Sequence, residues 1–283
     1  GKSTTMRMIM GLDKPTSGKV TVNGRPYRDL SAPLCEVGAL LDAKGLHGSR
    51  NARNHLRQLA ASNGIPAKRV DEVLEITGLT SVAKKRVKGF SLGMGQRLGI
   101  AAALLGDPGV LLFDEPVNGL DPEGVKWVRE TCRRLAGEGR TVFISSHLMS
   151  EMAQTADQLL VIGRGRILSA GPVDDVIASA TTDRVRVASP QATQLAELMA
   201  ARNLAAHPVG PSLLETTSAT AATIGELAAQ GGIVLHELTT IHASLEEAYL
   251  TLTSDSVEYR TDPTHQLAPQ PLDQAAQQSL PRP

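Results

Sequence analysis

The sequence predicts an α/β domain built on a parallel sheet, followed by a smaller α+β unit. The first observation is a pair of apolar runs typical of buried strands, at residues 110–113 (VLLF) and 141–146 (TVFISS). The second is the amphipathic segment 123–137 between them, because strand–helix–strand alternation usually connects parallel strands. The third is another apolar run at 36–41 (EVGALL), which supplies one more strand to the same sheet.

The N-terminal elements follow from cap and turn signals. Residues 2–10 are expected to form a short helix that ends at Gly11, a residue type favoured just past a helix C-terminus. Residues 19–25 alternate between apolar and polar and reach Asn23-Gly24, a pair typical of hairpin turns. This segment is therefore predicted to be a strand that enters a hairpin.

A long helical stretch and a hairpin complete the first unit. Residues 52–106 should be mostly helical, with breaks at 64–66 and around Gly78 where helix-breaking residues occur. Residues 158–171 (QLLVIGRGRILSAG) are expected to form two short strands around their Gly-Arg-Gly-Arg turn.

A change of composition near residues 178–183 (ASATTD) predicts a boundary between a domain at 1–177 and an accessory α+β unit at 178–255. In that second unit we expect strand 184–189, helix 190–203, strand 213–217, helix 219–230, strand 233–238 and helix 244–252. The segment 256–283 is rich in Pro and Gln without periodicity, so it is expected to be disordered.

Composition excludes several classes of protein. Lys+Arg and Asp+Glu are both 29, so the net charge is zero and gives no sign of a polycationic nucleic-acid surface or a basic membrane-binding face. No apolar run reaches the ~18–20 residues of a spanning helix. Cys35 and Cys132 lie far apart without metal-ligand spacing, as expected for free, reduced thiols of a cytosolic protein.

Two short motifs have the chemistry of a nucleotide site. Gly1-Lys2-Ser3-Thr4 matches the end of the phosphate-binding loop G-x-x-x-x-G-K-[ST], in which the Lys reaches the β- and γ-phosphates and the Ser ligates Mg²⁺. A polar helix start remains the alternative for so short a match. In VLLFDEP (110–116), Asp114 and Glu115 end an apolar strand, where ligand sites of open α/β sheets lie. Asp114 could hold Mg²⁺ and Glu115 could act as general base, the alternative being two solvated acids at a strand end.

Two further motifs are weaker alone. FSLGMGQR (90–97) precedes an apolar helix, and its backbone N–H groups could bind phosphate; an ordinary N-cap at Ser91 is the other interpretation. FISSHL (143–148) places His147 just after a strand, where the imidazole could bond a γ-phosphate or serve a structural purpose.

The ordered set GKST, SLGMGQR, LLFDEPVNGLDP and SSHLM resembles the nucleotide-binding domain of ABC transporters over residues 1 to about 175. The resemblance implies a P-loop NTPase core of the ABC ATPase type with a helical signature subdomain at about 50–106. The region after residue 178 resembles the C-terminal extension of bacterial drug- and bacteriocin-exporter ATPases. Its role, as a packing accessory or in dimer support and regulation, stays open.

The same resemblance implies roles for individual residues. It places the phosphate-binding loop at Gly1, Lys2, Ser3 and Thr4, the Walker B pair at Asp114 and Glu115, the signature motif at Ser91 and Gly93, the D-loop at Asp121 and the switch histidine at His147. Glu115 and His147 would be catalytic, and Ser3 and Asp114 would ligate Mg²⁺. Two such domains would pair head to tail and sandwich two ATP molecules, so Ser91 and Gly93 would reach the nucleotide held by the partner.

The sequence departs from the family pattern at three places. Met94 stands where the glutamine of LSGGQ is usual, and Asp42 occupies the expected position of the Q-loop glutamine, as in the drug- and bacteriocin-exporter branch. The chain begins with Gly1, so an N-terminal truncation is expected that leaves out the first strands, the adenine-stacking aromatic residue and half of the phosphate-binding loop. The chain as written is therefore expected to bind ATP poorly and to be inactive.

These features predict an ATP-binding and hydrolysing subunit that uses ATP and Mg²⁺ to energise export of a drug, antibiotic or peptide through a separate membrane permease. It would be cytoplasmic, at the inner face of the cell membrane. An ABC ATPase acting on nucleic acid or ribosomes is a second possibility, disfavoured by the zero net charge, the single domain and the lack of sustained heptads. A binding-only module is a third.

Overall fold

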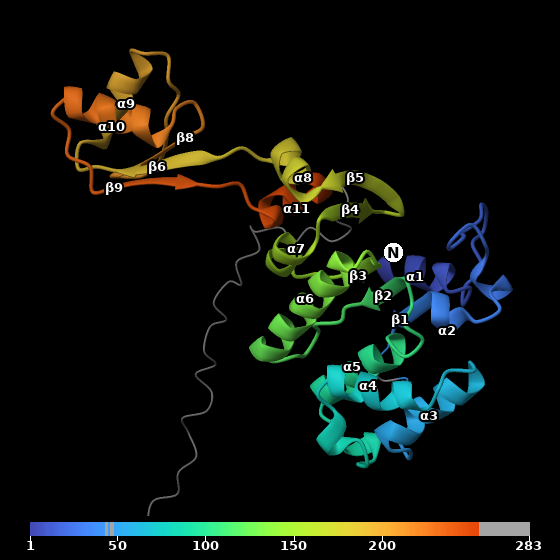
Figure 1. Cartoon of the computed structure of the whole chain (residues 1–283). Helices are drawn as coiled ribbons and strands as arrows, with labels where there is room; N and C mark the ends of the chain where they lie inside the picture. The colour runs from blue at the N-terminus through green and yellow to red at the C-terminus, as the bar shows by residue number, and fades with distance from the viewer. Residues whose placement is uncertain (43–44, 46–47, 255–283) are drawn as a thin grey trace, which may run out of the picture.

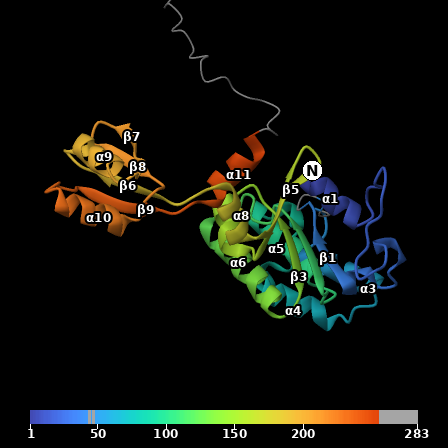
Figure 2. The same cartoon turned by 90° about the horizontal axis from the view of Figure 1, so that it is seen from above.

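The computed structural model describes residues 1–42, 45 and 48–254, and the predicted disordered segment 256–283 lies outside them. Figure 1 shows two bodies: a larger one around a parallel sheet, and a smaller one formed by the C-terminal part of the chain. The view from above shows the smaller body projecting from one side of the larger one, joined to it by two extended connections (Figure 2).

The larger body is organised around a three-stranded parallel sheet in the order β1-β2-β3. The strands are β1 (Val37–Leu40), β2 (Val110–Asp114) and β3 (Thr141–Ser145), which confirms the three strands predicted from the apolar runs. Asp114 is in register with Ser145. Because parallel strands end at the same edge, the polar residues that follow β2 and β3 are brought together there.

Helices surround this sheet. They are α1 (Lys2–Ile9), α2 (Pro33–Glu36), α5 (Leu92–Ala103), α6 (Pro122–Gly137) and α7 (Met149–Thr155). α1 contacts β2, α5 contacts β1 and α6 contacts β3. Gly38 allows the close approach of α5, since a Cβ there would lie 2.0 Å from the carbonyl oxygen of Ala103.

The predicted helical stretch is confirmed as a set of short helices. α3 (Ala52–Ser62) and α4 (Lys68–Ile76) lead through two 3₁₀ turns, Thr80–Val82 and Val87–Gly89, into α5. The breaks lie at Gly64 and Gly78, with φ of +66° and +69°, left-handed values that favour glycine. Figure 1 shows these helices together at one end of the larger body.

The strand predicted at residues 19–25 is wrong. Only an isolated bridge between Val22 and Arg25 forms, and no other strand in the described part of the chain pairs with this segment. The hairpin turn itself is confirmed, because Asn23 and Gly24 adopt φ of 50° and 80°. The residue types at the turn were therefore sufficient to predict it, whereas a strand also needs a neighbouring strand with which to form hydrogen bonds.

The hairpin predicted at residues 158–171 is confirmed. It consists of the antiparallel strands β4 (Gln158–Gly163) and β5 (Arg166–Pro172), joined through Arg164 and Gly165, which both have positive φ. The helix α8 (Val173–Ala180) follows directly. The domain limit expected at residue 177 thus falls inside a helix, and the break in regular structure comes at 181–183.

The smaller body has a four-stranded antiparallel sheet in the order β7-β8-β6-β9. Its elements are β6 (Arg184–Ala188), α9 (Ala192–Ala200), β7 (His207–Gly210), β8 (Leu213–Thr216), α10 (Ala221–Gln230) and β9 (Glu237–Ile241). The last strand was expected at 233–238 and starts later. Ile233 is instead buried in the core of this body, and the Val234 carbonyl accepts a hydrogen bond from Ser189 Oγ at 2.7 Å.

The final helix, α11 (Leu245–Thr253), leaves the smaller body. It was expected within the accessory unit, but it packs against α7 and α8 of the larger body. The reason is its apolar face, on which Leu245 and Ala248 are 3% and 0% exposed. Beside α11, Asp183 accepts hydrogen bonds from His242 Nδ1 and the Ala243 N–H, both at 2.8 Å. These bonds link the segment before β6 to the segment after β9, the two connections between the bodies.

Within the described ranges, none of the helices is both long and apolar enough to cross a bilayer. Both cysteines are free thiols, as predicted. Burial raises the pKa of the Cys132 thiol to about 12, so this side chain stays protonated and serves as a small apolar residue of the core.

Candidate active site

The first residue of α1 reaches the end of the central strand. Lys2 Nζ lies 2.7 Å from Glu115 Oε1 and donates a second hydrogen bond, of 2.9 Å, to the backbone carbonyl of Ser146. The Lys2 and Glu115 side chains are 39% and 25% exposed, so the pair is open to a ligand. The sequence motifs around these two residues, more than a hundred positions apart, therefore meet at one place.

The backbone at Glu115 has an unusual conformation. Its φ is +48°, in the left-handed region that residues other than glycine rarely adopt. The Glu115 N–H donates hydrogen bonds to two oxygens of Ser145, the carbonyl oxygen at 3.2 Å and Oγ at 3.0 Å. Such backbone outliers cluster at functional sites, where the surrounding structure maintains them. Here the turn directs the carboxylate toward α1 rather than along the strand.

His147 completes a three-residue cluster. Its Nδ1 lies 2.7 Å from Glu115 Oε2, so each carboxylate oxygen of Glu115 has its own partner. Burial raises the pKa of Glu115, but the hydrogen bonds and charges of Lys2 and His147 lower it by more, and the net pKa lies below its ordinary value. Glu115 is therefore a carboxylate at neutral pH, as a general base must be.

Asp114 is held by the neighbouring strand. Ser145 Oγ donates a hydrogen bond to Asp114 Oδ1, and Ser145 itself is 5% exposed. Ser3 and Thr4 lie exposed on the first turn of α1, which packs against β2. A hydroxyl and a carboxylate are hard oxygen donors of the kind Mg²⁺ takes together with water and phosphate oxygens. The donor set of Ser3 and Asp114 thus fits that ion, although no group of three His, Cys, Asp or Glu gathers among the described residues.

Other predicted site residues lie away from this cluster. Ser91 caps α5, because its Oγ accepts the Met94 N–H at 3.2 Å, and Asp121 caps α6 by accepting the Gly124 N–H at 3.0 Å. Ser91 and Asp121 are therefore the N-cap residues of these two helices. Neither residue forms a hydrogen bond to Lys2 or Glu115 in the described structure.

The segments around these two caps touch each other. A Cβ on Gly93 would lie 3.3 Å from Leu120 Cδ2, and a Cβ on Gly119 would lie 2.1 Å from Leu92 Cδ2. Segment 91–94 and segment 118–121 therefore form one contiguous surface. Asp42 is exposed two residues after the end of β1.

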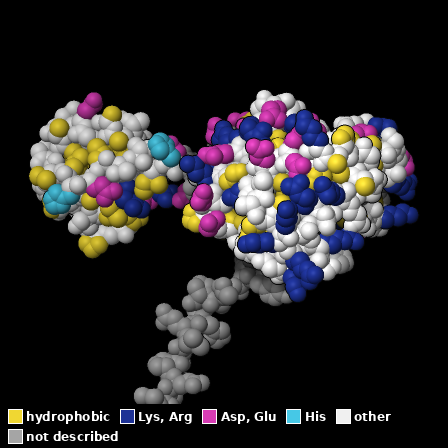
Figure 3. All heavy atoms as spheres, turned by 60° about the horizontal axis from the view of Figure 1, so that its bottom comes forward, with side chains coloured by type: hydrophobic (Ala, Val, Ile, Leu, Met, Phe, Trp, Pro, Cys, Tyr) yellow, Lys and Arg dark blue, Asp and Glu magenta, His cyan; other side chains and the backbone are white. Residues whose placement is uncertain are grey.

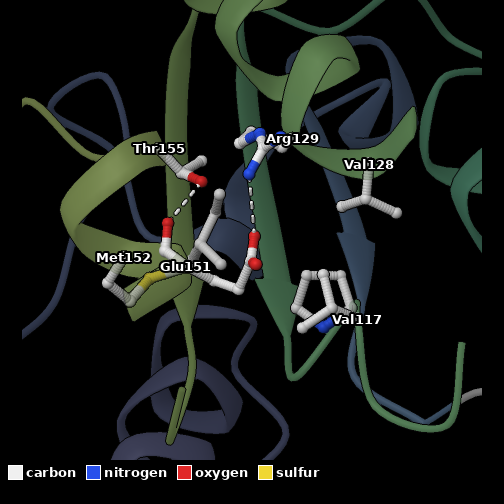
Figure 4. Close-up of a pocket in the computed structure, with 8 residues that line it drawn as sticks. Val117, Val128, Arg129, Glu151, Met152 and Thr155 are labelled. Carbon is white, nitrogen blue, oxygen red and sulfur yellow. Dashed lines mark hydrogen bonds and ion pairs between the residues drawn. The ribbon is translucent and has the colours of Figure 1, made fainter. Parts of the chain in front are cut away.

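An ion pair links α6 to α7 beside this surface (Figure 4). Arg129 Nη1 lies 3.3 Å from Glu151 Oε2 and 2.8 Å from Gln154 Oε1. The cavity lined by Arg129, Glu151, Val117, Val128, Met152 and Thr155 has a volume of about 10 Å³. That cavity has space for about one water molecule. Arg129 and Glu151 also line a wider hollow of about 310 Å³ together with Leu120, Pro122, Val125 and Lys126.

Sequence reasoning missed the two serines before His147. Ser145 holds Asp114 and the Glu115 N–H, and the Ser146 carbonyl accepts from Lys2. The sequence did contain a signal for them. Ser145 and Ser146 end an apolar strand that is parallel to the strand ending in Asp114 and Glu115, so both pairs must lie at the same edge of the sheet. The Arg129–Glu151 pair had no such signal, since its members come from separate helices.

The Lys2–Glu115 ion pair should make stability depend on pH. The folded-state pKa of Glu115 is lowered, so its contribution is present above the unfolded pKa of about 4.3 and is lost as pH falls through the folded pKa. We expect Lys2→Met to destabilise the chain at about pH 6 and much less at about pH 3. Urea unfolding followed by the fluorescence of Trp127, the single tryptophan, measures this.

The matched control is Lys14→Met, which removes an exposed lysine that forms no ion pair with any residue the structure describes. It should have a small effect at both pH values. A destabilisation by Lys2→Met that stays the same from about pH 6 to about pH 3 would show that Glu115 is not the partner.

Comparison with known proteins agrees with this geometry. Residues 1–118 match the family model described as "ABC transporter", and residues 183–246, which span the smaller sheet, match a domain of unknown function. The chain is 45% identical over 177 residues to the bacitracin transport ATP-binding protein BcrA of Bacillus licheniformis, covering 62% of this chain and 58% of that protein.

A longer match is to the uncharacterized ABC transporter ATP-binding protein YhcH of Bacillus subtilis, 34% identical over 262 residues, 91% of this chain and 85% of that protein. Among solved structures, an ATP-binding subunit of an ABC transporter superimposes with a TM-score of 0.58 at 26% identity, covering 63% of this chain and 77% of that one. With the four motifs in order and the Lys2–Glu115–His147 cluster at one sheet edge, the chain belongs to the ATP-binding proteins of ABC transporters.

Proposed function

We propose that this protein binds and hydrolyses ATP to energise the export of a small molecule, a drug, antibiotic or peptide, through a separate membrane permease. The observation that carries the proposal is the meeting of Lys2, Glu115 and His147 at the carboxyl edge of the parallel sheet. Family membership supports the same conclusion, and BcrA, 45% identical, is by name a bacitracin transport ATP-binding protein.

In the proposed reaction, Lys2 turns from Glu115 to the β- and γ-phosphates, because the phosphates carry more negative charge than one carboxylate. Glu115 is then free to accept the proton of the attacking water as general base. His147, released from Glu115, donates a hydrogen bond to the γ-phosphate. Mg²⁺, when bound by Ser3 and Asp114, supplies charge stabilisation to the phosphoryl oxygens. Ser145 keeps Asp114 oriented through its hydroxyl hydrogen bond.

The exposed segment that contains Ser91 and Gly93 lies apart from the Lys2 cluster, which supports completion of the site by a second domain. We propose a homodimer, or a pair with another ATPase domain, that sandwiches two ATP molecules. Gly1 and Thr4 would contact the phosphate of their own subunit. Ser91 and Gly93, with Asp121 beside them, would contact the nucleotide of the partner. Asp42, at the Q-loop position, would sense Mg²⁺.

The permease would be an integral-membrane subunit, so this protein would be cytoplasmic and peripheral on the inner face of the cell membrane. The experiment is ATP-dependent accumulation of bacitracin in inside-out vesicles that contain the full-length gene product and the permease encoded beside it. Uptake should require hydrolysable ATP and both proteins. Hydrolysis that is independent of any permease, together with co-purifying RNA or DNA, would reject export.

A further inference from the structure

The helical segment before the signature motif concentrates positive charge. Residues 48–88 contain nine Lys or Arg and three Asp or Glu, a net charge of +6, whereas the whole chain is neutral. The expectation of no polycationic surface, drawn from the net charge, therefore does not hold for this segment. Acidic residues elsewhere in the chain bring its total charge to zero, but they do not belong to this segment and leave it positively charged.

The fold brings five of these cations onto two paired segments, which we call the basic patch: Arg50, Lys84, Lys85, Arg86 and Lys88. Asn51 and Arg86 form an antiparallel bridge. The Val87 N–H donates to the Arg50 carbonyl at 2.9 Å, and the Lys88 N–H donates to the Gly48 carbonyl at 3.0 Å. Two loops separated by more than thirty residues thus form one surface.

Buried neighbours hold the patch in place. Ala83 and Val87 are 1% and 8% exposed and belong to the main core, while Lys84, Lys85 and Lys88 are exposed between and beside them. A Cβ on Gly48 would lie 3.2 Å from Lys88 Cβ, which shows how closely the two loops approach. The lysine stems therefore project from an ordered backbone rather than from a loose loop.

No side chain of the basic patch forms an ion pair or a side-chain hydrogen bond within the part of the chain that the structure describes. Its neighbours differ in this respect, because Arg53 pairs with Asp71 and Arg69 pairs with Glu72. Figure 3, which brings the bottom of Figure 1 forward, shows Lys and Arg without nearby Asp or Glu on the lower part of the larger body, and both kinds of charge mixed along its upper and left parts. The positive charge is thus uncompensated at the surface.

We propose that the basic patch binds the anionic headgroups of the membrane leaflet next to the permease. Clusters of four to eight Lys or Arg are the usual size for binding anionic lipids, and each cation near such a surface raises binding about fivefold. Three of the five are lysines, compact charges on flexible stems that suit a diffuse anionic surface better than a fixed carboxylate. The orientation of the patch toward the membrane rests on the proposed function, in which this protein docks on an integral-membrane permease.

Nucleic acid is a poorer occupant. Binding of single strands relies on aromatic side chains that stack on bases. The aromatic residue nearest in sequence, Phe90, is packed against the main core. An acidic segment of the permease is the other alternative, and the experiment separates it from lipid.

The experiment measures partition of the full chain onto vesicles by flotation. The probes are vesicles of phosphatidylcholine alone and of phosphatidylcholine with about 30% phosphatidylglycerol, a strongly anionic composition. We expect binding to the anionic vesicles only, and its loss at about 0.5 M salt, where the Debye length falls to a few ångströms. The quadruple variant Lys84→Gln, Lys85→Gln, Arg86→Gln and Lys88→Gln should lower this partition at least about tenfold.

The matched control is Lys14→Gln, Lys19→Gln, Arg164→Gln and Arg166→Gln, which removes four exposed cations outside the patch. It should bind like the unaltered chain, and a thermal melt of each variant verifies folding. Equal binding of the two variants to the anionic vesicles overturns the proposal. A second set of neutral vesicles contains the permease. If the patch variant loses binding only to that set, the patch binds a protein segment and the proposal is also overturned. Flotation with the anionic vesicles needs neither ATP nor a permease. A failure of lipid binding can therefore be distinguished from a failure of the proposed export function.

Discussion

Glu115→Gln is expected to slow ATP turnover by about 10²-fold or more, the loss typical of removing a general base, while ATP remains bound. The amide keeps the size of the side chain but cannot take a proton from water. Lys2, which contacts Glu115 at 2.7 Å, remains available for the phosphates. Single-turnover hydrolysis and filter binding of ATP with the full-length gene product measure the two effects separately.

The control for this change is Glu130→Gln, an exposed glutamate on α6 whose partner is Lys126 at 3.8 Å. It should hydrolyse ATP at the normal rate. Near-normal turnover in Glu115→Gln would remove Glu115 from the role of base. A loss of ATP binding equal to the loss of turnover would instead place Glu115 in nucleotide binding.

Phe113→Ala is expected to reduce the free energy of unfolding of the larger body by about 3–5 kcal/mol. Phe113 is fully buried on β2, one residue before the strand ends, and is the largest fully buried side chain of the molecule as described. Its removal leaves a cavity between the sheet and the surrounding helices that neighbours can fill only in part. Urea unfolding monitored by Trp127, on α6 beside the same core, reports on this body alone.

The matched comparison is Leu160→Ala on β4, where the side chain is 45% exposed. We expect this variant to unfold within about 1 kcal/mol of the unaltered chain, because little apolar surface is returned to water. Equal effects of the two substitutions would show that β2 is not the centre of the cooperative core.

The sequence alone was sufficient for the elements that are determined locally. The strands at 110–114 and 141–145 each carry a continuous apolar run, and the helix between them carries a regular amphipathic pattern. The motif residues Lys2, Glu115 and His147 could be named because their chemistry depends on short, ordered stretches. Local hydrophobic pattern and turn chemistry are properties of neighbouring residues, so a single sequence contains them.

The tertiary structure decided what depends on partners distant in the chain. Residues 19–25 alternate like a strand but find no neighbour to pair with, and α11 leaves the smaller body because its apolar face is buried by α7 and α8. The support of Asp114 by Ser145 depends on strand register. The basic patch depends on the pairing of residues 48–51 with 86–88, which turns a neutral composition into a charged surface. Pairing, register and burial are interactions across space, and for that reason only the folded chain determined them.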